Sequence, residues 1–159
     1  MHSLSRPWLL IFCVLCIVAL GGLSGLSTVS GLRDWYVHLH KPFFNPPNSV
    51  FGPVWTVLYV FMGFTLYRLI ILPASGERTL VIFFFIIQLI LNLAWSVIFF
   101  YLQKPGWALI EIITLWGFIL LMIRKSILLD KLAGYIQIPY LLWVSFATLL
   151  NAALWWLNR

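Results

Sequence analysis

Residues 79–103 read TLVIFFFIIQLILNLAWSVIFFYLQ, and none of these 25 residues is charged. Arg78 and Lys104 bound the stretch on its two sides. A helix needs about 20 apolar residues to cross the roughly 30 Å hydrocarbon core of a bilayer. The stretch therefore predicts a transmembrane helix.

Four more windows of the same kind fill the rest of the chain. Residues 7–32, 42–67 and 132–158 contain no charged residue, and residues 105–123 contain a single acid, Glu111. We therefore predict an all-α membrane protein, a bundle of five transmembrane helices that forms a single domain over residues 1–159. The predicted spans are residues 8–28, 49–71, 79–102, 107–123 and 134–157.

The composition excludes most other classes of protein. The chain is 63% hydrophobic and only 9% charged, whereas about a quarter of the residues of a soluble domain are charged. The abundance of apolar and aromatic residues also argues against disorder. The net charge of +6 would suggest nucleic acid in a soluble protein. Here the basic residues flank the spans, so no nucleic-acid partner is expected.

The first span has an alternative interpretation as a signal peptide, because Arg6 precedes an apolar run and a stretch of small residues. Cleavage would leave four helices. The small residues Gly21, Ser24, Gly25 and Thr28 share one face of a helix, and this arrangement suits close helix packing. We therefore expect the first span to remain part of the bundle.

Two short patterns raise the question of a metal site. Cys13 and Cys16 form a C-x-x-C inside an apolar span, where no polar neighbour could stabilise a thiolate. His38 and His40 form an H-x-H one turn from Asp34, without a cysteine or a second acid nearby. The cysteines are interpreted as apolar packing residues, and no metal site is predicted.

The first joint is long, aromatic and rich in proline. Residues 30–48 read SGLRDWYVHLHKPFFNPPN, and the prolines restrict the backbone and disfavour helix in the residues before them. The aromatic residues are too apolar for a freely solvated loop. We expect this joint to fold over one end of the bundle as a lid. The alternative is an aromatic belt at the depth of the lipid headgroups.

Aromatic and polar side chains recur at helical spacing on four predicted spans, and this pattern predicts one special face on each helix. The four stripes are Phe51, Trp55, Tyr59 and Met62; Gln88, Asn92, Trp95 and Phe99; Trp107, Glu111, Thr114 and Phe118; and Trp143, Ala147, Leu150, Asn151 and Leu154. Such faces could simply pack the bundle. With nine Trp in the chain, we favour a cavity that binds a flat apolar ligand by stacking and a few hydrogen bonds.

Glu111 lies about one turn into the fourth span. A charge near the bilayer centre would cost about 3 kcal/mol, so a position closer to an interface is expected. We interpret this residue as a structural tether, with a proton relay as the alternative.

Several blocks of the chain together resemble one known family. They are WY at 35–36, KPFFNPP at 41–47, VFGPVWTVLY at 50–59, QLILNLAW at 88–95, GWAL at 106–109 and PYLLWVSFATLLN at 139–151. This combination is similar to the motifs of the translocator protein family (TspO, formerly the peripheral benzodiazepine receptor family). The blocks cover the first joint and four of the five predicted helices.

The resemblance implies a five-helix bundle, usually a homodimer, with a pocket beneath the first loop. Members bind porphyrins such as protoporphyrin IX and haem, sterols such as cholesterol, and synthetic isoquinoline carboxamide or benzodiazepine ligands. The residues that the resemblance assigns to the pocket are Phe51, Trp55, Tyr59, Asn92, Trp95, Trp107, Trp143, Phe146, Ala147 and Leu150. The lid residues expected at its mouth are Trp35, Tyr36, Lys41, Pro46 and Pro47.

One departure concerns sterols. The family's sterol motif needs a tyrosine near the C-terminus, and residues 149–159 contain Trp155 and Trp156 but no tyrosine. Sterol recognition through that motif is therefore not expected here.

The leading hypothesis is a membrane protein that binds tetrapyrroles and similar flat hydrophobic ligands and regulates their level or transport. It requires no cofactor, and porphyrin or haem is its ligand. The second hypothesis is a light- and oxygen-dependent porphyrin-degrading enzyme, since some bacterial members are similar to photo-oxidases that use two tryptophans aligned with Trp55 and Trp143. The third is a transporter of porphyrins or sterols. The membrane is either a bacterial membrane or the mitochondrial outer membrane.

Overall fold

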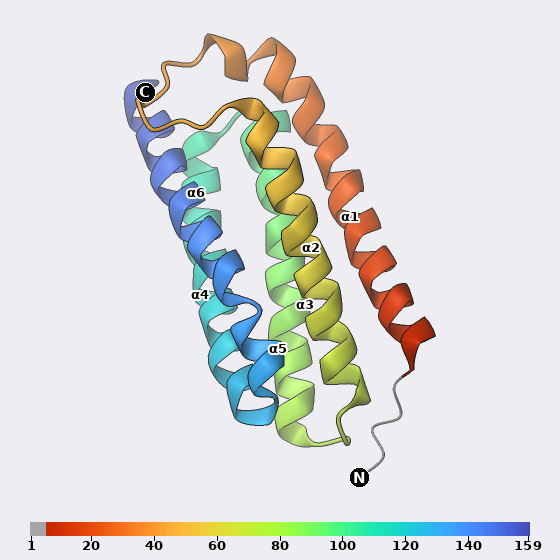
Figure 1. Ribbon diagram of the computed structural model, residues 1–159. Coiled ribbons are helices and arrows are strands. Elements are labelled where there is room, and N and C mark those ends of the chain that lie inside the picture. Colours follow the sequence, from red (N-terminus) through yellow and green to blue (C-terminus); the bar gives the residue numbers. More distant parts are fainter. Residues whose placement is uncertain (1–5) are drawn as a thin grey trace.

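The computed structural model describes residues 6–159, and all the regular elements in this range are helical. Five of its helical segments are long and apolar enough to cross a membrane. Figure 1 shows them side by side in one bundle, with the start of α1 and the end of α6 at opposite ends. The predicted all-α bundle of five membrane helices is confirmed, and the chain is an integral membrane protein.

Helix α1 spans Pro7–Asp34. A proline in the first turn suits a helix start, because the N–H groups there have no partner within the helix. The helix runs six residues beyond the predicted end at residue 28. A Cβ atom on Gly31 would lie 2.5 Å from the carbonyl oxygen of Phe100, so only glycine allows this backbone approach. That contact holds the last turns of α1 against the bundle. The periodicity of the sequence gives no sign of it, so the predicted end of this helix was too early.

The first joint is shorter than predicted because α1 occupies its first residues. It consists of residues 35–47, which we call the lid, and contains one 3-10 turn, η1, at Tyr36–His38. Helix α2 then spans Asn48–Ile71 and begins directly after Pro47. Pro53 therefore lies inside α2. Figure 1 shows the lid crossing the end of the bundle from α1 toward the C-terminal end of α6.

Helix α3 spans Gly76–Ser96 and starts at a serine cap, where the Ser75 hydroxyl accepts a hydrogen bond from the Arg78 backbone N–H. It continues as a π-helical turn, η2, at Val97–Tyr101. Such turns interrupt the regular helix and are frequent at functional sites. Here η2 carries two aromatic rings, Phe99 and Phe100, that are buried beneath the lid.

Helix α4 spans Pro105–Leu129, and two elements follow it: the short α5 at Lys131–Tyr135 and the long α6 at Ile138–Leu157. The predicted fifth span is therefore divided near its start. The division lies at Ile136–Gln137, and Pro139 in the first turn of α6 suits the helix start that follows it. The start of α5 is marked by Asp130, whose side chain accepts a hydrogen bond from the Ala133 N–H. Asp130 also pairs with Arg68 of α2 at 2.6 Å, which fixes this junction at the end of the bundle opposite the lid.

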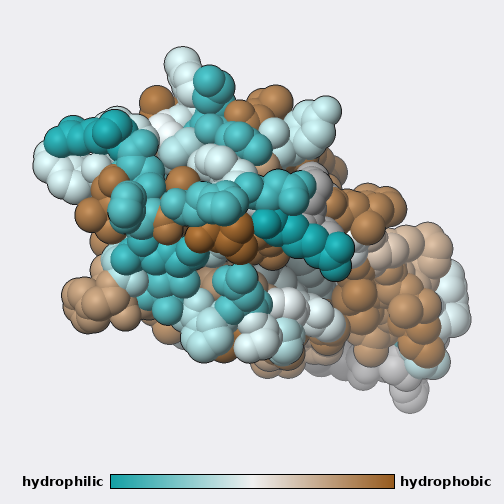
Figure 2. All heavy atoms as spheres, turned by 90° about the horizontal axis from the view of Figure 1, so that it is seen from above, coloured by the Kyte–Doolittle hydropathy of each residue, from teal (hydrophilic) through white to brown (hydrophobic). Residues whose placement is uncertain are grey.

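The outer surface of the bundle suits lipid better than water. Large apolar side chains on α1, α3, α4 and α6 are more than half exposed, among them Leu23, Ile90, Ile113 and Leu142. Lipid tails are as apolar as these side chains, so exposure costs little in a membrane. Figure 2 looks onto the lid end and shows hydrophilic side chains gathered over it. The lid thus lies at an end of the bundle that faces water.

Candidate ligand-binding site

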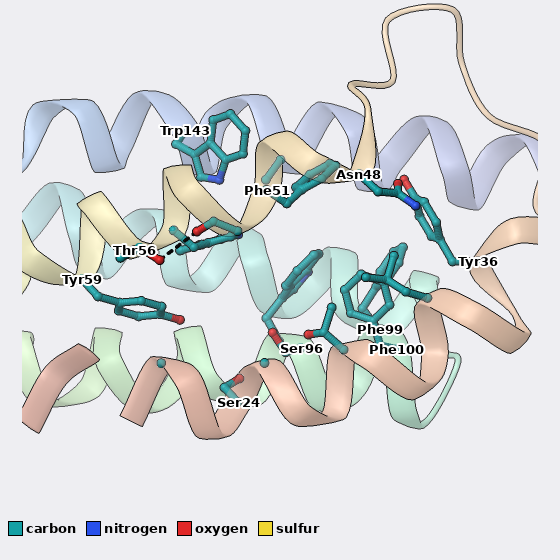
Figure 3. A pocket seen from close by; sticks show the side chains of 18 of the residues that line it. Ser24, Tyr36, Asn48, Phe51, Thr56, Tyr59, Ser96, Phe99, Phe100 and Trp143 are labelled. Carbon is teal, nitrogen blue, oxygen red and sulfur yellow. Dashed lines mark hydrogen bonds between the residues drawn. The ribbon is translucent and has the colours of Figure 1, made fainter. Parts of the chain in front are cut away.

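A cavity of about 430 Å³ lies beneath the lid, between α1, α2, α6 and the junction of α3 with η2. This volume falls within the range of roughly 300–1,000 Å³ that is typical of small-molecule sites. Figure 3 shows its long axis running along the helices, from Tyr36 and Asn48 at the lid end to Tyr59 at the deep end. The cavity is therefore elongated and lies within the bundle.

Aromatic rings form most of the cavity wall. On α2, the ring of Trp55 stacks on that of Tyr59 with 5.7 Å between centroids. The Phe51 ring meets Trp143 of α6 edge to face at 5.9 Å. Trp95 of α3 stacks on Phe99 of η2 at 5.1 Å. These contacts fix the rings relative to one another, so the wall presents preformed apolar surfaces to a ligand.

Most polar groups of the wall are already paired. The Trp95 indole donates a 3.0 Å hydrogen bond to the Asn151 side-chain oxygen, and the Asn151 amide donates to the Pro105 carbonyl at 2.8 Å. Trp143 differs, because its Nε1 atom is buried and has no hydrogen-bond partner among the described residues. A buried N–H without a partner is costly. A small rotation of the indole toward a ligand acceptor would remove that cost.

A chain of buried hydrogen bonds supports the deep end of the cavity. Tyr59 donates to Asn92 of α3 at 2.8 Å, and the Asn92 amide donates to Tyr140 of α6 at 3.0 Å. Tyr140 in turn donates to Gln88 at 2.9 Å. Three helices are therefore joined behind Tyr59, the phenol at the deep end of the cavity.

Glu111 lies beside this chain. Both of its carboxyl oxygens are buried without a hydrogen-bond partner among the described residues, and it interacts electrostatically with Tyr140. The structure therefore offers no hydrogen bond to support the predicted tether. The proton relay stays a hypothesis.

The lid is held over the cavity by specific contacts. The Tyr36 hydroxyl donates a 2.7 Å hydrogen bond to the Asn45 side chain, and the Tyr36 ring packs on Phe99 and Phe100. Burial raises the pKa of Tyr36 to about 12, although the bond to Asn45 partly opposes the shift. The phenol is therefore neutral at physiological pH and remains a donor. Beyond the tyrosine, the Lys41 ammonium lies over its ring, 5.0 Å from the centroid.

A second attachment joins the lid to the end of α6. The His40 backbone N–H donates to the Asn158 side-chain oxygen, and the Asn158 amide donates back to the His40 carbonyl, both at 2.9 Å. The Phe44 ring contacts Phe146 of α6, whereas Phe43 is fully exposed. The first joint thus folds over the bundle end, and of these two rings only Phe43 has the exposure expected of an aromatic belt.

The comparison with protein families agrees with these features. Residues 12–157 match the model of the TspO/MBR family. The chain belongs to the TspO/MBR family. The match includes α2, α3 and α6, which carry most of the aromatic residues of the cavity wall.

Individual members of the TspO/MBR family are similar over most of their length. The tryptophan-rich protein TspO of Chlorobaculum tepidum is 41% identical over 125 residues, which cover 78% of this chain and 79% of the relative. The protein of the same name from Archaeoglobus fulgidus is 41% identical over 135 residues, covering 82% and 84%. The human translocator protein is 38% identical over 129 residues, covering 79% and 75%.

The residues that the TspO/MBR resemblance assigns to the pocket fall into two groups in this structure. Those that line the cavity are Phe51, Trp55, Tyr59, Trp95, Trp143, Ala147 and Leu150. Asn92 lies behind Tyr59 and does not line it. Phe146 lies behind Trp143 and lines a shallow apolar depression between α2 and α6.

Trp107 differs most from the expectation, because it is 68% exposed on the outside of α4 and does not line the cavity. The buried face of α4 instead carries Ala108, Ile112, Leu115 and Ile119. Tryptophan is enriched at membrane–water interfaces, and Trp107 lies in the first turn of α4. Apolar periodicity alone therefore could not tell the two faces of this helix apart.

The predicted lid residues lie at the lid end of the bundle, but only one of them lines the cavity. Tyr36 does so, while Trp35 packs its ring against Phe99 at 5.5 Å. Lys41 lies outside the cavity, over Tyr36. Pro46 and Pro47 lead the chain into the first turn of α2.

Sequence reasoning missed the contribution of α1. Its small residues Gly21, Gly22, Ser24, Gly25 and Thr28 line the cavity. All of these except Gly22 were interpreted from the sequence as a surface for helix packing, and Gly21 does pack closely on the Tyr59 ring. The signal that could have identified the others is their small size, because a cavity forms where a helix carries little side-chain volume.

Proposed function

We propose that this protein binds tetrapyrroles such as protoporphyrin IX and haem as reversible ligands, and that it regulates their level or transport in the membrane. The observation that carries the proposal is the convergence of Phe51, Trp55, Tyr59, Trp95 and Trp143 on one uncharged cavity. Membership of the TspO/MBR family supports it.

The wall chemistry fits a flat, conjugated ring. Aromatic pairs gain about 0.5–1.5 kcal/mol beyond the effect of burial when their rings stack or meet edge to face. The paired rings of Trp55 and Tyr59 offer such a surface on one side of the cavity. The buried Nε1 of Trp143 has no partner among the described residues, so a small rotation of the indole would offer a hydrogen-bond donor to the ligand. Together these groups can hold a large apolar ring in a defined orientation.

Titration of the purified protein with protoporphyrin IX tests the proposal. We expect a saturable shift of the main porphyrin absorption band, because the ring moves from water into an aromatic pocket. A double variant, Trp55→Ala and Trp143→Ala, should bind more weakly than wild type with its helical content unchanged. Failure of the wild-type protein to show saturable binding would contradict the proposal.

A second candidate function is supported by one observation. Trp55 and Trp143, the two tryptophans assigned to photo-oxidation by the family resemblance, line the same cavity from α2 and α6. A bound porphyrin could therefore lie against both. In this hypothesis oxygen is the oxidant, and illumination of the aerobic complex degrades the porphyrin. Illumination without oxygen should leave it intact, and equal losses under both conditions would contradict the enzymatic hypothesis.

A further inference from the structure

The cavity carries no charge of its own. Its lining, which belongs entirely to the described part of the chain, contains no lysine, arginine, histidine, aspartate or glutamate. Protoporphyrin IX and haem each bear two propionic acid groups on one edge of the ring. A carboxylate buried without a partner is strongly unfavourable. The acid edge of such a ligand must therefore find a cation or water outside the cavity wall.

A cation lies at one end of the cavity, behind a residue that lines it. Tyr36 forms part of the wall at the lid end and is only 3% exposed. The Nζ atom of Lys41 lies 5.0 Å from the centroid of the Tyr36 ring. In Figure 3, Tyr36 and Asn48 mark this end, while Tyr59 marks the deep end. The deep end is backed by the side chains of Asn92, Tyr140 and Gln88, with the carboxyl group of Glu111 beside Tyr140, and none of these groups is a cation.

The ammonium group of Lys41 is held by two hydrogen bonds and can donate a third. It donates to the carbonyl oxygens of Val37 at 3.3 Å and Leu39 at 3.4 Å, and an ammonium group has three N–H donors. Asp34 is the acid of this region, and no ion pair joins it to Lys41 among the described residues. Lys41 is exposed, so a third partner can approach from the water side of the lid.

The charges at the opposite end of the bundle are arranged differently. Both ion pairs found within residues 6–159 lie there, between Arg68 and Asp130 and between Lys125 and Glu77. Figure 2 shows hydrophilic side chains over the lid end, and neither ion pair involves Lys41. An anion is thus better accommodated at the lid end.

We propose that Lys41 is a specificity determinant that binds the carboxylate edge of a flat hydrophobic acid. The ring then lies among the aromatic side chains, and the acid groups point toward the lid and water. This inference rests on the proposed function and adds the ligand's orientation and its chemical class. The uncapped N-terminus of α2, which begins at the cavity-lining Asn48, adds partial positive charge at the same end.

The test compares protoporphyrin IX with its dimethyl ester, which has the same ring but no charge. Affinities are measured for wild type, Lys41→Gln, Lys41→Arg and the control Lys104→Gln, an exposed lysine that does not line the cavity. Lys41→Gln should weaken binding of the acid by about two- to fivefold, the range of an exposed ion pair. Its binding of the ester should not change. Lys41→Arg and Lys104→Gln should bind both ligands as wild type does.

The outcomes separate this inference from the proposed function. Equal weakening of acid and ester by Lys41→Gln would show that the lysine only supports the lid, and it would overturn the inference. Unchanged binding of both ligands would overturn the inference as well, while leaving the cavity assignment intact. If wild type bound neither ligand, the proposed function would fail and the inference with it.

Discussion

Tyr59 of α2 donates a 2.8 Å hydrogen bond to the side-chain oxygen of Asn92 on α3. Asn92 does not line the cavity, but through this bond it fixes a phenol that does. Tyr140 and Gln88 extend the chain of bonds to α6 and back to α3. The cavity wall is thereby tied to the polar core of the bundle.

Removing the hydroxyl from that chain should destabilise the bundle while leaving the cavity surface in place. In Tyr59→Phe, the buried oxygen of Asn92 loses its donor, which costs about 1–3 kcal/mol of unfolding free energy. The ring can still stack on Trp55, so ligand affinity should change little. Thermal melting in detergent measures the loss, with Tyr135→Phe as a control because Tyr135 is 52% exposed. Equal melting temperatures for the two variants would contradict this role of Tyr59.

Two adjacent glycines of α1 should respond very differently to alanine. A Cβ on Gly21 would collide with the Tyr59 ring, whereas a Cβ on Gly22 would meet nothing within 4 Å. Gly21→Ala should therefore displace Tyr59, with an overpacking cost of about 1–3 kcal/mol and weaker ligand binding. Gly22→Ala should be neutral or stabilising, because alanine favours helix. Melting and ligand titration of the pair check this, and indistinguishable variants would mean that α1 does not approach Tyr59 as described.

The lid is expected to control access to the cavity rather than hold the bundle together. Replacing Pro46 and Pro47 with alanine should loosen the loop by widening its conformational freedom. Ligand binding should weaken, and most of the helical content should remain. Circular dichroism and ligand titration of the double variant measure the two effects. Collapse of the helical fold would make the lid a structural brace.

Ala147 lines the cavity one turn from Trp143 and is 8% exposed. In Ala147→Thr, the added hydroxyl can bond to the carbonyl of Trp143 and bend α6 slightly. The larger side chain should overpack this site at a cost of about 1–3 kcal/mol. It should also narrow the cavity and lower ligand affinity tenfold or more, with only a modest loss of stability. Ala153→Thr, on the same helix but outside the cavity lining, is the matched control. A lowered melting temperature with unchanged affinity would place Ala147 in bundle packing alone.

The parts that sequence predicted well depend on strong local signals. The stripe of Trp143, Ala147, Leu150, Asn151 and Leu154 lines the cavity as a set. It could be predicted because a buried asparagine and a small residue at helical spacing mark an inward face, whereas lipid disfavours the amide. The five spans followed from charge spacing for a similar reason, since charged groups cannot enter hydrocarbon at low cost.

The parts that were missed depend on tertiary contacts or on the nature of the solvent. Trp107 and Trp143 have the same side chain, yet one faces outward and the other lines the cavity. Lipid and a bundle interior are both apolar, so hydropathy does not separate them. The extension of α1 to Asp34 depends on the contact between Gly31 and Phe100. Residues this far apart in the sequence give no local signal of their approach.

Tryptophan fluorescence with protoporphyrin IX tests the central claim most directly. We expect the porphyrin to quench tryptophan emission with micromolar or better affinity. Trp55→Phe and Trp143→Phe should each reduce the quenched fraction, because these indoles line the cavity. The sequence pattern predicted that Trp107 belongs to the same group. Its outward position instead makes Trp107→Phe the matched control, and this variant should keep the wild-type affinity. Quenching that is unchanged in Trp55→Phe and Trp143→Phe would contradict binding of the porphyrin in this cavity.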